Sequence, residues 1–329
     1  MTLVELLVVV AILGLLSVVV LPNLSKSSDA RKAREAARSV SGFVSNMQSR
    51  AIGTRGGGGL WIEPLPNAIT DSLGVDHVVA IDFFAAQIPE PYAGEALNSA
   101  VIVAPASSGT VANLTFQNGF VLPPTLTTSS NMMLRFTGSP SLFRLPPFSG
   151  TPATATMNLG RNQTPYNTAW PVTTSTGVAY EVLLAAVRDP AVSLTLGDGM
   201  AVDLTWSHLG TLGPWGFAPT STPPLQPSQM LYDSAGRPSD VVRSGGLSEP
   251  IIDTICLLVA PLEMIQEGTC FTKPGAYWVA IEPRGGTPRV AEVLPLSAAA
   301  LDSKNRPATV DALVVSQTYV RQSTFQEGR

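Results

Sequence analysis

Residues 1–21 read MTLVELLVVVAILGLLSVVVL, and the interpretation of the whole chain starts from this apolar run. It holds one charged residue, Glu5, and the sixteen residues from Leu6 to Leu21 carry no charge. A helix rises about 1.5 Å per residue, so the run would reach about 31 Å, roughly the hydrocarbon thickness of a bilayer. We therefore expect an apolar N-terminal helix that spans a membrane or lies in a hydrophobic bundle.

Glu5 is the unusual residue of this run. A carboxylate at mid-bilayer depth costs about 2.5–3.5 kcal/mol, so Glu5 either lies at headgroup level or awaits a cationic partner. A secretory signal peptide does not fit, because no basic region precedes the apolar run. No small-residue cleavage pattern ends it either, since the run closes with Leu21-Pro22-Asn23.

The N-terminal run resembles the N-terminus of mature type IV pilins and of the pseudopilins of type II secretion. Thr2-Leu3, Glu5, the aliphatic run, Gly14 and Pro22 all stand in that family's register. The resemblance implies that a prepilin peptidase removes a leader and that the new N-terminal residue is N-methylated. That residue is Met1, where the family usually has Phe; Met1 is an accepted variant or an initiator Met. The resemblance also implies that Glu5 pairs with the N-terminal ammonium of a neighbouring subunit, and a proline in a helix predicts a kink or a melted turn near Gly14 to Pro22.

Composition predicts a β-rich, loop-rich protein outside the cytoplasm. Charged residues are 13% of the chain, and Gly and Pro together make up 56 of 329 positions. The charge is uneven: residues 24–55 hold seven basic and two acidic side chains, net +5, and residues 56–329 hold thirteen basic and twenty-one acidic ones, net −8. The acidic body argues against nucleic acid as a partner.

The charge pattern and the helix signals divide the chain into two parts. Residues 1–54 are expected to form the spine helix, with an apolar part at 1–21 and an amphipathic part at 30–52. The amphipathic part carries one seam of mostly small residues: Ala30, Ala33, Ala37, Val40, Val44, Met47 and Ala51. A run of four glycines ends the helix, and residues 55–329 form the head. The expected fold class is α+β, a long N-terminal spine helix, kinked or melted near Pro22, with a large β-rich head.

The head carries strand signals divided by turn residues. The expected strands are His77–Phe84, Ala100–Ala104, Val111–Phe116, Met132–Phe136, Val192–Leu196, Met200–Trp206, Gln229–Tyr232, Ile251–Val259, Tyr277–Glu282 and Arg289–Leu294. Tyr180–Arg188 fits a strand or a short helix, and short helices are expected at Leu296–Asp302 and Val310–Val320. Pro-, Thr- and Ser-rich loops are expected at Leu122–Ser130, Leu145–Thr156 and Pro214–Ser228.

The head also resembles, loosely, the heads of H-type minor pseudopilins. Two features carry this resemblance: the motif Ser49-Arg50-Ala51-Ile52 at the expected end of the helix, and a later strand followed by a Gly turn at Leu231 to Pro238. On this resemblance, residues 66–228 are an enlargement of the head or a second β subdomain.

The sequence offers few residues for chemistry. Cys256 and Cys270 are expected to form one disulfide in an oxidising compartment, or else to be two buried thiols. The only histidines, His77 and His208, are expected to be structural, and no motif for a catalytic, cofactor or metal site is present. Asp198 and Asp203 flank a turn that favours a plain hairpin over a calcium site.

The sequence therefore predicts a structural, non-enzymatic subunit of a type IV pilus-like filament without a cofactor. Its expected partners are copies of itself or related pilins and pseudopilins, the prepilin peptidase, and the inner membrane before assembly. The head is expected to lie outside the cytoplasm before assembly, and in a periplasmic or extracellular filament afterwards. The alternatives are a minor or tip pseudopilin of type II secretion, or an adhesin that uses a pilin anchor.

Overall fold

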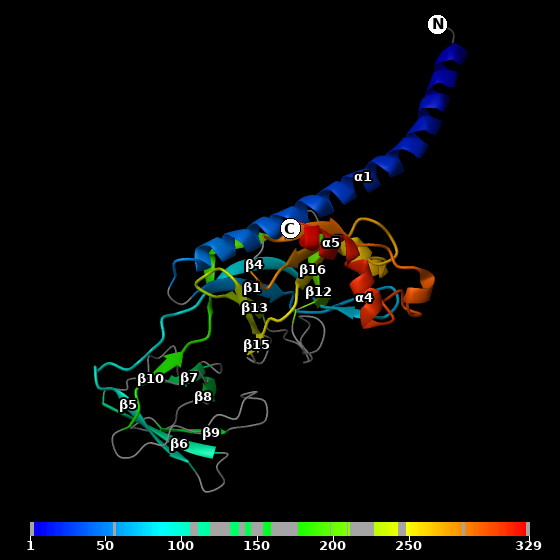
Figure 1. Cartoon of the computed structure of the whole chain (residues 1–329). Coiled ribbons are helices and arrows are strands. Elements are labelled where there is room, and N and C mark those ends of the chain that lie inside the picture. Colours follow the sequence, from blue (N-terminus) through cyan, green and yellow to red (C-terminus); the bar gives the residue numbers. More distant parts are fainter. Residues whose placement is uncertain are drawn as a thin grey trace.

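The computed structural model describes residues 3–54, 57–105, 111–118, 132–137, 142–145, 154–158, 177–197, 199–208, 210, 227–242, 248–284 and 287–326 (Figure 1). α1 (Leu3–Ala51) is a single helical element, and its side chains are described mainly from residue 29 onward. Several predicted features lie outside the described residues, among them Met1, Asp198, the loop Leu122–Ser130 and most of the loop Pro214–Ser228.

A ten-stranded sheet organises the described head, and all of its pairings are antiparallel. The strand order is β15-β14-β13-β1-β4-β12-β16-β17-β18, and β11 pairs with β4. The bounds are β1 (Gly58–Pro64), β4 (Val79–Gln87), β11 (Val187–Thr195), β12 (Met200–His208), β13 (Ser228–Tyr232), β14 (Pro238–Val242), β15 (Ser248–Pro250), β16 (Ile255–Pro261), β17 (Tyr277–Ile281) and β18 (Arg289–Glu292).

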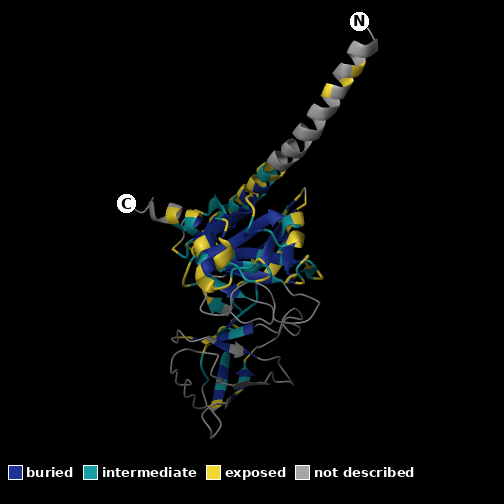
Figure 2. Cartoon of the chain, turned by 90° about the vertical axis from the view of Figure 1, so that its right-hand side faces the viewer, coloured by how far each residue is buried: buried dark blue, intermediate teal, exposed yellow. Residues whose placement is uncertain are grey.

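The centre of this sheet is buried on both faces. Every residue of β16 and of β17 is buried, because successive side chains point to opposite faces and both faces are covered. Leu257 and Val279 belong to a first core under α1, whereas Leu258 and Trp278 belong to a second core on the other face. The second core is closed by three short helices, α3 (Leu262–Glu267), α4 (Val310–Ser316) and α5 (Thr318–Gln326). Figure 2 shows the buried residues concentrated in this layered part of the molecule.

α1 lies across the first face of the sheet. Six of the seven predicted seam residues, at spacings of four and three, are at most 1% exposed: Ala33, Ala37, Val40, Val44, Met47 and Ala51. They pack with Leu60, Phe83 and Val259 in the first core. A stripe at this spacing follows one face of a helix, so the prediction of a core-facing seam is confirmed.

A second unit is inserted between β4 and β11. It contains a three-stranded sheet of β5 (Ala100–Pro105), β6 (Val111–Gln117) and β9 (Thr154–Asn158), and another of β10 (Tyr180–Leu183), β7 (Met132–Phe136) and β8 (Leu142–Leu145). The two sheets share a core of their own, which includes Phe116, Leu134 and Tyr180. The unit lies on the side of the large sheet away from α1 (Figures 1 and 2).

The fold class expected from the sequence, α+β with a long spine helix, is wrong. The chain is mostly β-sheet, with 43% strand and one large antiparallel sheet. The N-terminal helix that packs on the head, at residues 29–51, is amphipathic rather than apolar, because one side meets the sheet and the other meets solvent. The part of α1 at residues 29–51 is therefore one layer of the head rather than an apolar spine that stands apart from it. In the part of the chain that the structure describes, no helix combines the length and the apolarity of a membrane span.

Candidate functional site

The residues predicted to direct assembly lie at the start of α1. Met1 precedes the described residues, and Glu5, Gly14 and Pro22 fall inside α1 at positions whose side chains are not described. The melted turn predicted near Pro22 is not formed, since α1 runs as one element from Leu3 to Ala51. A proline inside a helix is accommodated by bending, and Figure 1 shows α1 curved along its length.

Large apolar side chains near the start of α1 have no cover within the described part of this chain. Leu7 is 63% exposed, Val10 60% and Ile12 52%. Isolated surface hydrophobics are ordinary, but these three lie within two turns of one another in an apolar run. The segment therefore offers an apolar surface to lipid or to another protein.

The other half of α1 is fixed to the head by polar contacts as well as by its seam. The guanidinium of Arg34 lies 5.8 Å from the centre of the Tyr277 ring on β17. The pKa of Arg34 is raised, chiefly by its interaction with Tyr277 and also by the nearby Glu292, despite some desolvation. The Ser41 hydroxyl donates to the carbonyl of Pro288 at 3.2 Å. These contacts and the buried seam together fix this half of α1 to the head.

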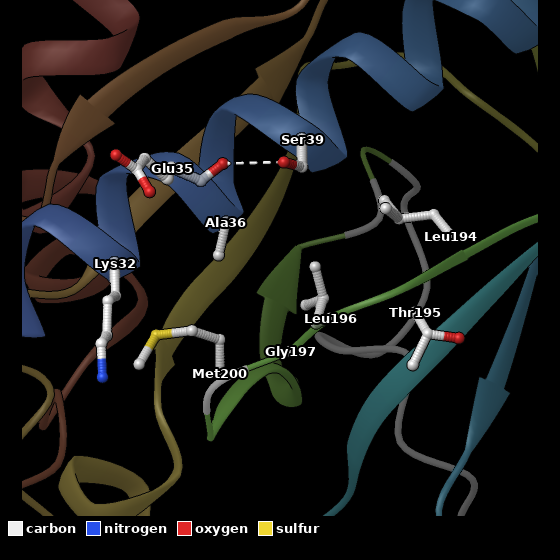
Figure 3. Close-up of a pocket in the computed structure, with 9 residues that line it drawn as sticks. All are labelled: Lys32, Glu35, Ala36, Ser39, Leu194, Thr195, Leu196, Gly197 and Met200. Carbon is white, nitrogen blue, oxygen red and sulfur yellow. Dashed lines mark hydrogen bonds between the residues drawn. The ribbon is translucent and has the colours of Figure 1, made fainter.

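A groove separates α1 from the segment that connects β11 to β12 (Figure 3). The plain hairpin predicted at this turn is not formed, because β11 and β12 each pair with β4 rather than with one another. The cavity volume of the groove is about 140 Å³. The lining residues are Lys32, Glu35, Ala36, Ser39, Leu194, Thr195, Leu196, Gly197 and Met200. In Figure 3 Lys32 extends toward Met200, whereas the carboxylate of Glu35 points away from the β11–β12 connection. Lys32 is therefore the cation of a groove whose opposite wall, Leu194 to Met200, is largely apolar.

A buried cluster of titratable side chains surrounds His77. Its Nδ1 lies 2.7 Å from Asp203 Oδ2 and its Nε2 lies 3.3 Å from Asp71 Oδ2. All three side chains are buried, and the second oxygen of each carboxylate accepts backbone N–H groups, from Thr205 at Asp203 and from Leu73 and Val75 at Asp71. Burial disfavours charge on His77, but the hydrogen bonds and charges of Asp203 and Asp71 outweigh it and raise the pKa of His77.

The carboxyl of Asp71 shifts in the opposite direction. Burial alone would raise the pKa of Asp71, but hydrogen bonds from Val75, His77 and Leu73 hold it below its ordinary value. The raised pKa of His77 and the lowered pKa of Asp71 favour the ion-paired form, in which both ring nitrogens of His77 donate to carboxylates. Because both ring nitrogens are occupied, His77 has no lone pair to take a proton from a nucleophile, as a general base must.

The two cysteines do not supply a nucleophile. Both are free thiols buried in the second core, so the predicted disulfide is not formed in the structure. Cys256 lies on β16 opposite His208 of β12, and Cys270 lies in the turn after α3. Burial raises the pKa of Cys256 to about 12 and that of Cys270 well above its ordinary value. A buried thiol of this kind is unreactive, because the thiolate is the nucleophile.

His77 and His208 are predicted from the sequence to be structural residues, and the structure places both in buried positions with polar contacts. His208 Nδ1 accepts the Gly210 N–H at 3.3 Å and lies 3.2 Å from the carbonyl of Thr254. The pairing of His77 with Asp71 and Asp203 was missed, because Asp203 is 126 positions away in the sequence. Among the described residues, no group of His, Cys, Asp and Glu has the geometry to hold a metal ion.

Comparison with known proteins finds no matching family model, no matching curated protein and no matching solved structure.

Proposed function

We propose that this chain is a structural, non-enzymatic subunit of a type IV pilus-like filament. The observation that carries the proposal is the exposed apolar surface of Leu7, Val10 and Ile12, in a run that carries Glu5 as its single charge. In the filament this surface packs against the same segment of other copies or of related pilins. Before assembly the same surface is covered by the lipid of the inner membrane, with the head outside the cytoplasm.

Glu5 gives this packing its register. Lipid and a helix bundle are about equally apolar, so transfer between them provides little hydrophobic driving force. A carboxylate in an apolar bundle is costly unless a cation pairs with it, and the N-terminal ammonium at Met1 of a neighbouring copy is the cation that the pilin resemblance supplies. The docked half of α1 then holds the head at a fixed position on the filament.

One observation favours the alternative of a minor or tip subunit, or of a pilin-anchored adhesin. The inserted unit with β5 to β10 enlarges the head on the side away from α1. A tip subunit or an adhesin carries its additional surface in such a place. The stoichiometry of the chain in isolated filaments separates these functions, since a major subunit is the dominant band and a tip subunit is a trace.

The Glu5→Ala variant tests the proposal. We expect normal amounts of protein in the membrane fraction and a loss of the chain from sheared filaments, because the uncompensated partner charge opposes packing. Glu263→Ala is the matched control, since Glu263 is an exposed glutamate on the head. Filaments that contain wild-type amounts of the Glu5→Ala chain would overturn the proposal. Mass spectrometry of the mature N-terminus tests the prepilin peptidase and N-methylation at Met1 in one measurement.

A further inference from the structure

Three cations on α1 have no ion-pair partner within the described chain. Arg31, Lys32 and Arg38 lie on the docked helix away from its buried seam, and no carboxylate of the described residues is within ion-pair distance of them. Seven other cations form ion pairs within the chain: Arg50 with Asp189, Arg135 with Glu181, Arg188 with Glu63, Arg237 with Asp233, Lys273 with Glu267, Arg306 with Asp302 and Arg321 with Asp253. Arg31, Lys32 and Arg38 are therefore three cations on one helix whose charge is not balanced by an ion pair among the described residues.

The groove beside these cations has the shape and the chemistry to receive an acidic side chain. Lys32 projects into it, the hydroxyls of Ser39 and Thr195 line it, and Leu196 and Met200 form an apolar wall. Glu35, the carboxylate of α1 that lines the groove, points away from the β11–β12 connection (Figure 3). The Ser39 hydroxyl donates to the Glu35 carbonyl and the Thr195 hydroxyl donates to Asp82, so Lys32 is the lining residue that would meet an incoming carboxylate.

Lipid headgroups are a poor match for these cations. Arg31 follows the last residue of the apolar run, Leu21, by ten positions, and Arg38 by seventeen. At about 1.5 Å per residue the cations stand about 15–26 Å along the helix from the end of that run. Electrostatic attraction is screened over about 8 Å at physiological ionic strength, so a headgroup layer at the end of the run is out of reach. The acidic body of the protein, net −8 over residues 56–329, has the complementary charge.

We propose that the groove and the adjoining cations Arg31, Lys32 and Arg38 bind a carboxylate-bearing head surface of a second copy of this chain. The inference rests on the proposed function, because filament packing is what brings a second head beside α1. The apolar segment provides adhesion between copies, and the charged contact then fixes which surfaces of neighbouring heads meet.

Self-association of the full-length protein in a non-ionic detergent tests this contact separately from filament assembly. We expect the double variant Lys32→Glu/Arg38→Glu to weaken association by about tenfold or more and to remove most of its dependence on NaCl concentration, as measured by sedimentation. Lys32→Arg keeps the charge and should associate like the wild type. Arg284→Glu is the control, since Arg284 is an exposed cation on the head. An unchanged unfolding midpoint shows that the double variant is folded.

A photoreactive side chain at position 38 provides the second measurement, and it does not depend on the reversal variants being folded. We expect cross-links to the head of another copy; cross-links to lipid or to a different protein would overturn the inference. Association that is equally tight and equally salt-sensitive in the double variant would overturn it as well. If that happens while Glu5→Ala still blocks filaments, only the inference fails. If Glu5→Ala filaments are normal while the reversal weakens association, only the proposed function fails.

Discussion

At the scale of single residues, His77 is a buried side chain whose two ring nitrogens each contact a carboxylate. It bridges Asp71, in the loop before β3 (Asp76–His77), to Asp203 on β12. The backbone N–H groups that hold the two carboxylates fix their positions, and the imidazolium between them balances their charge. This cluster links the loop before β3 to strand β12 of the large sheet.

The His77→Gln variant should lose about 3–5 kcal/mol of unfolding free energy. Glutamine is neutral and leaves two buried carboxylates without a counter-ion, which is the costly way to break a buried pair. His208→Gln removes the other histidine, whose Nδ1 contacts backbone groups, and should cost about 1–2 kcal/mol. Urea unfolding of both variants measures the difference; equal losses would show that the His77 charge contributes nothing.

The same cluster predicts how stability depends on pH. The pKa of His77 is raised above its ordinary 6.5, so its contribution is complete below that pH and is lost as pH rises through the folded value. The pKa of Asp71 is lowered below its ordinary 3.8, so its contribution is complete above that pH and is lost as pH falls through the folded value. Thermal midpoints should therefore peak between these limits. The gap between wild type and His77→Gln should narrow above neutral pH, and a constant gap from about pH 5 to 9 would contradict this assignment.

At the scale of elements, local patterns predicted much of the structure. The small-residue seam of α1 is buried as predicted, because a helix period is visible in the sequence itself. Strands appear at all ten predicted positions, and Tyr180–Arg188, which fitted strand or helix, contributes to β10 and β11. The helix predicted at Val310–Val320 is divided into α4 and α5, and the one predicted at Leu296–Asp302 is reduced to a single 3₁₀ turn, η1 (Ala298–Ala300).

Features set by tertiary pairing were missed. Strict alternation along β12 would place Trp206 on the same side as Val202 and Leu204, but Trp206 packs with the second core. The reason is an irregular register between Asp203 and His208, which reverses the facing of the residues that follow. Strands β8 and β9, which overlap the two ends of the loop predicted at Leu145–Thr156, were missed too. These short strands are stabilised by the shared core of the inserted unit rather than by local propensity.

Two tight turns have the same hydrogen-bond pattern, and both carry the same short sequence motif. Asp233 and Asp302 each accept the backbone N–H groups two and four residues later. The Arg four residues on, Arg237 or Arg306, returns to the same carboxylate. Both turns have the sequence motif Asp-Ser-x-Gly/Asn-Arg-Pro, and the residue at its fourth position adopts the left-handed conformation.

The Gly236→Ala variant tests how the first of these turns supports α1. Gly236 has φ of 76°, and a Cβ there would lie 2.9 Å from the Ile52 side chain and 3.1 Å from the Gln48 carbonyl. Gly53→Ala is the matched control, because Gly53 has φ of 90° with open space around it. Both variants carry the backbone strain, about 1–2 kcal/mol, and only Gly236→Ala adds overpacking of about 1–3 kcal/mol. Equal unfolding midpoints would show that the turn does not press on the end of α1.

At the scale of the whole molecule, the large sheet ends in edges that are poor templates for another strand. β15 has three residues and ends at Pro250, Pro288 directly precedes β18, and Pro190 lies in the irregular part of β11. Proline lacks the N–H that a new strand needs, and short or bulged edges limit pairing. These edges therefore limit association of the molecule through its sheet.

The inserted unit can be removed where it joins the sheet. Gln87 ends β4 and Val187 begins β11, and these two residues are register partners in the antiparallel pair. Residues 88–186 thus occupy the position of a hairpin turn, and their strands pair with one another rather than with the large sheet. Replacing them with Asn-Gly gives the two-residue connection that such a pair of strands prefers.

We expect this deletion variant to keep the large sheet, the docked α1 and the His77 cluster. The reason is that, among the described residues, neither the first nor the second core contains a residue of the segment 88–186, which has a core of its own. Hydrogen exchange should show full protection in β16 and β17, with the intact chain as the reference, and unfolding should remain cooperative. Loss of protection in β16 would show that the two units fold as one, and that the enlargement of the head is part of its core rather than an addition to its surface.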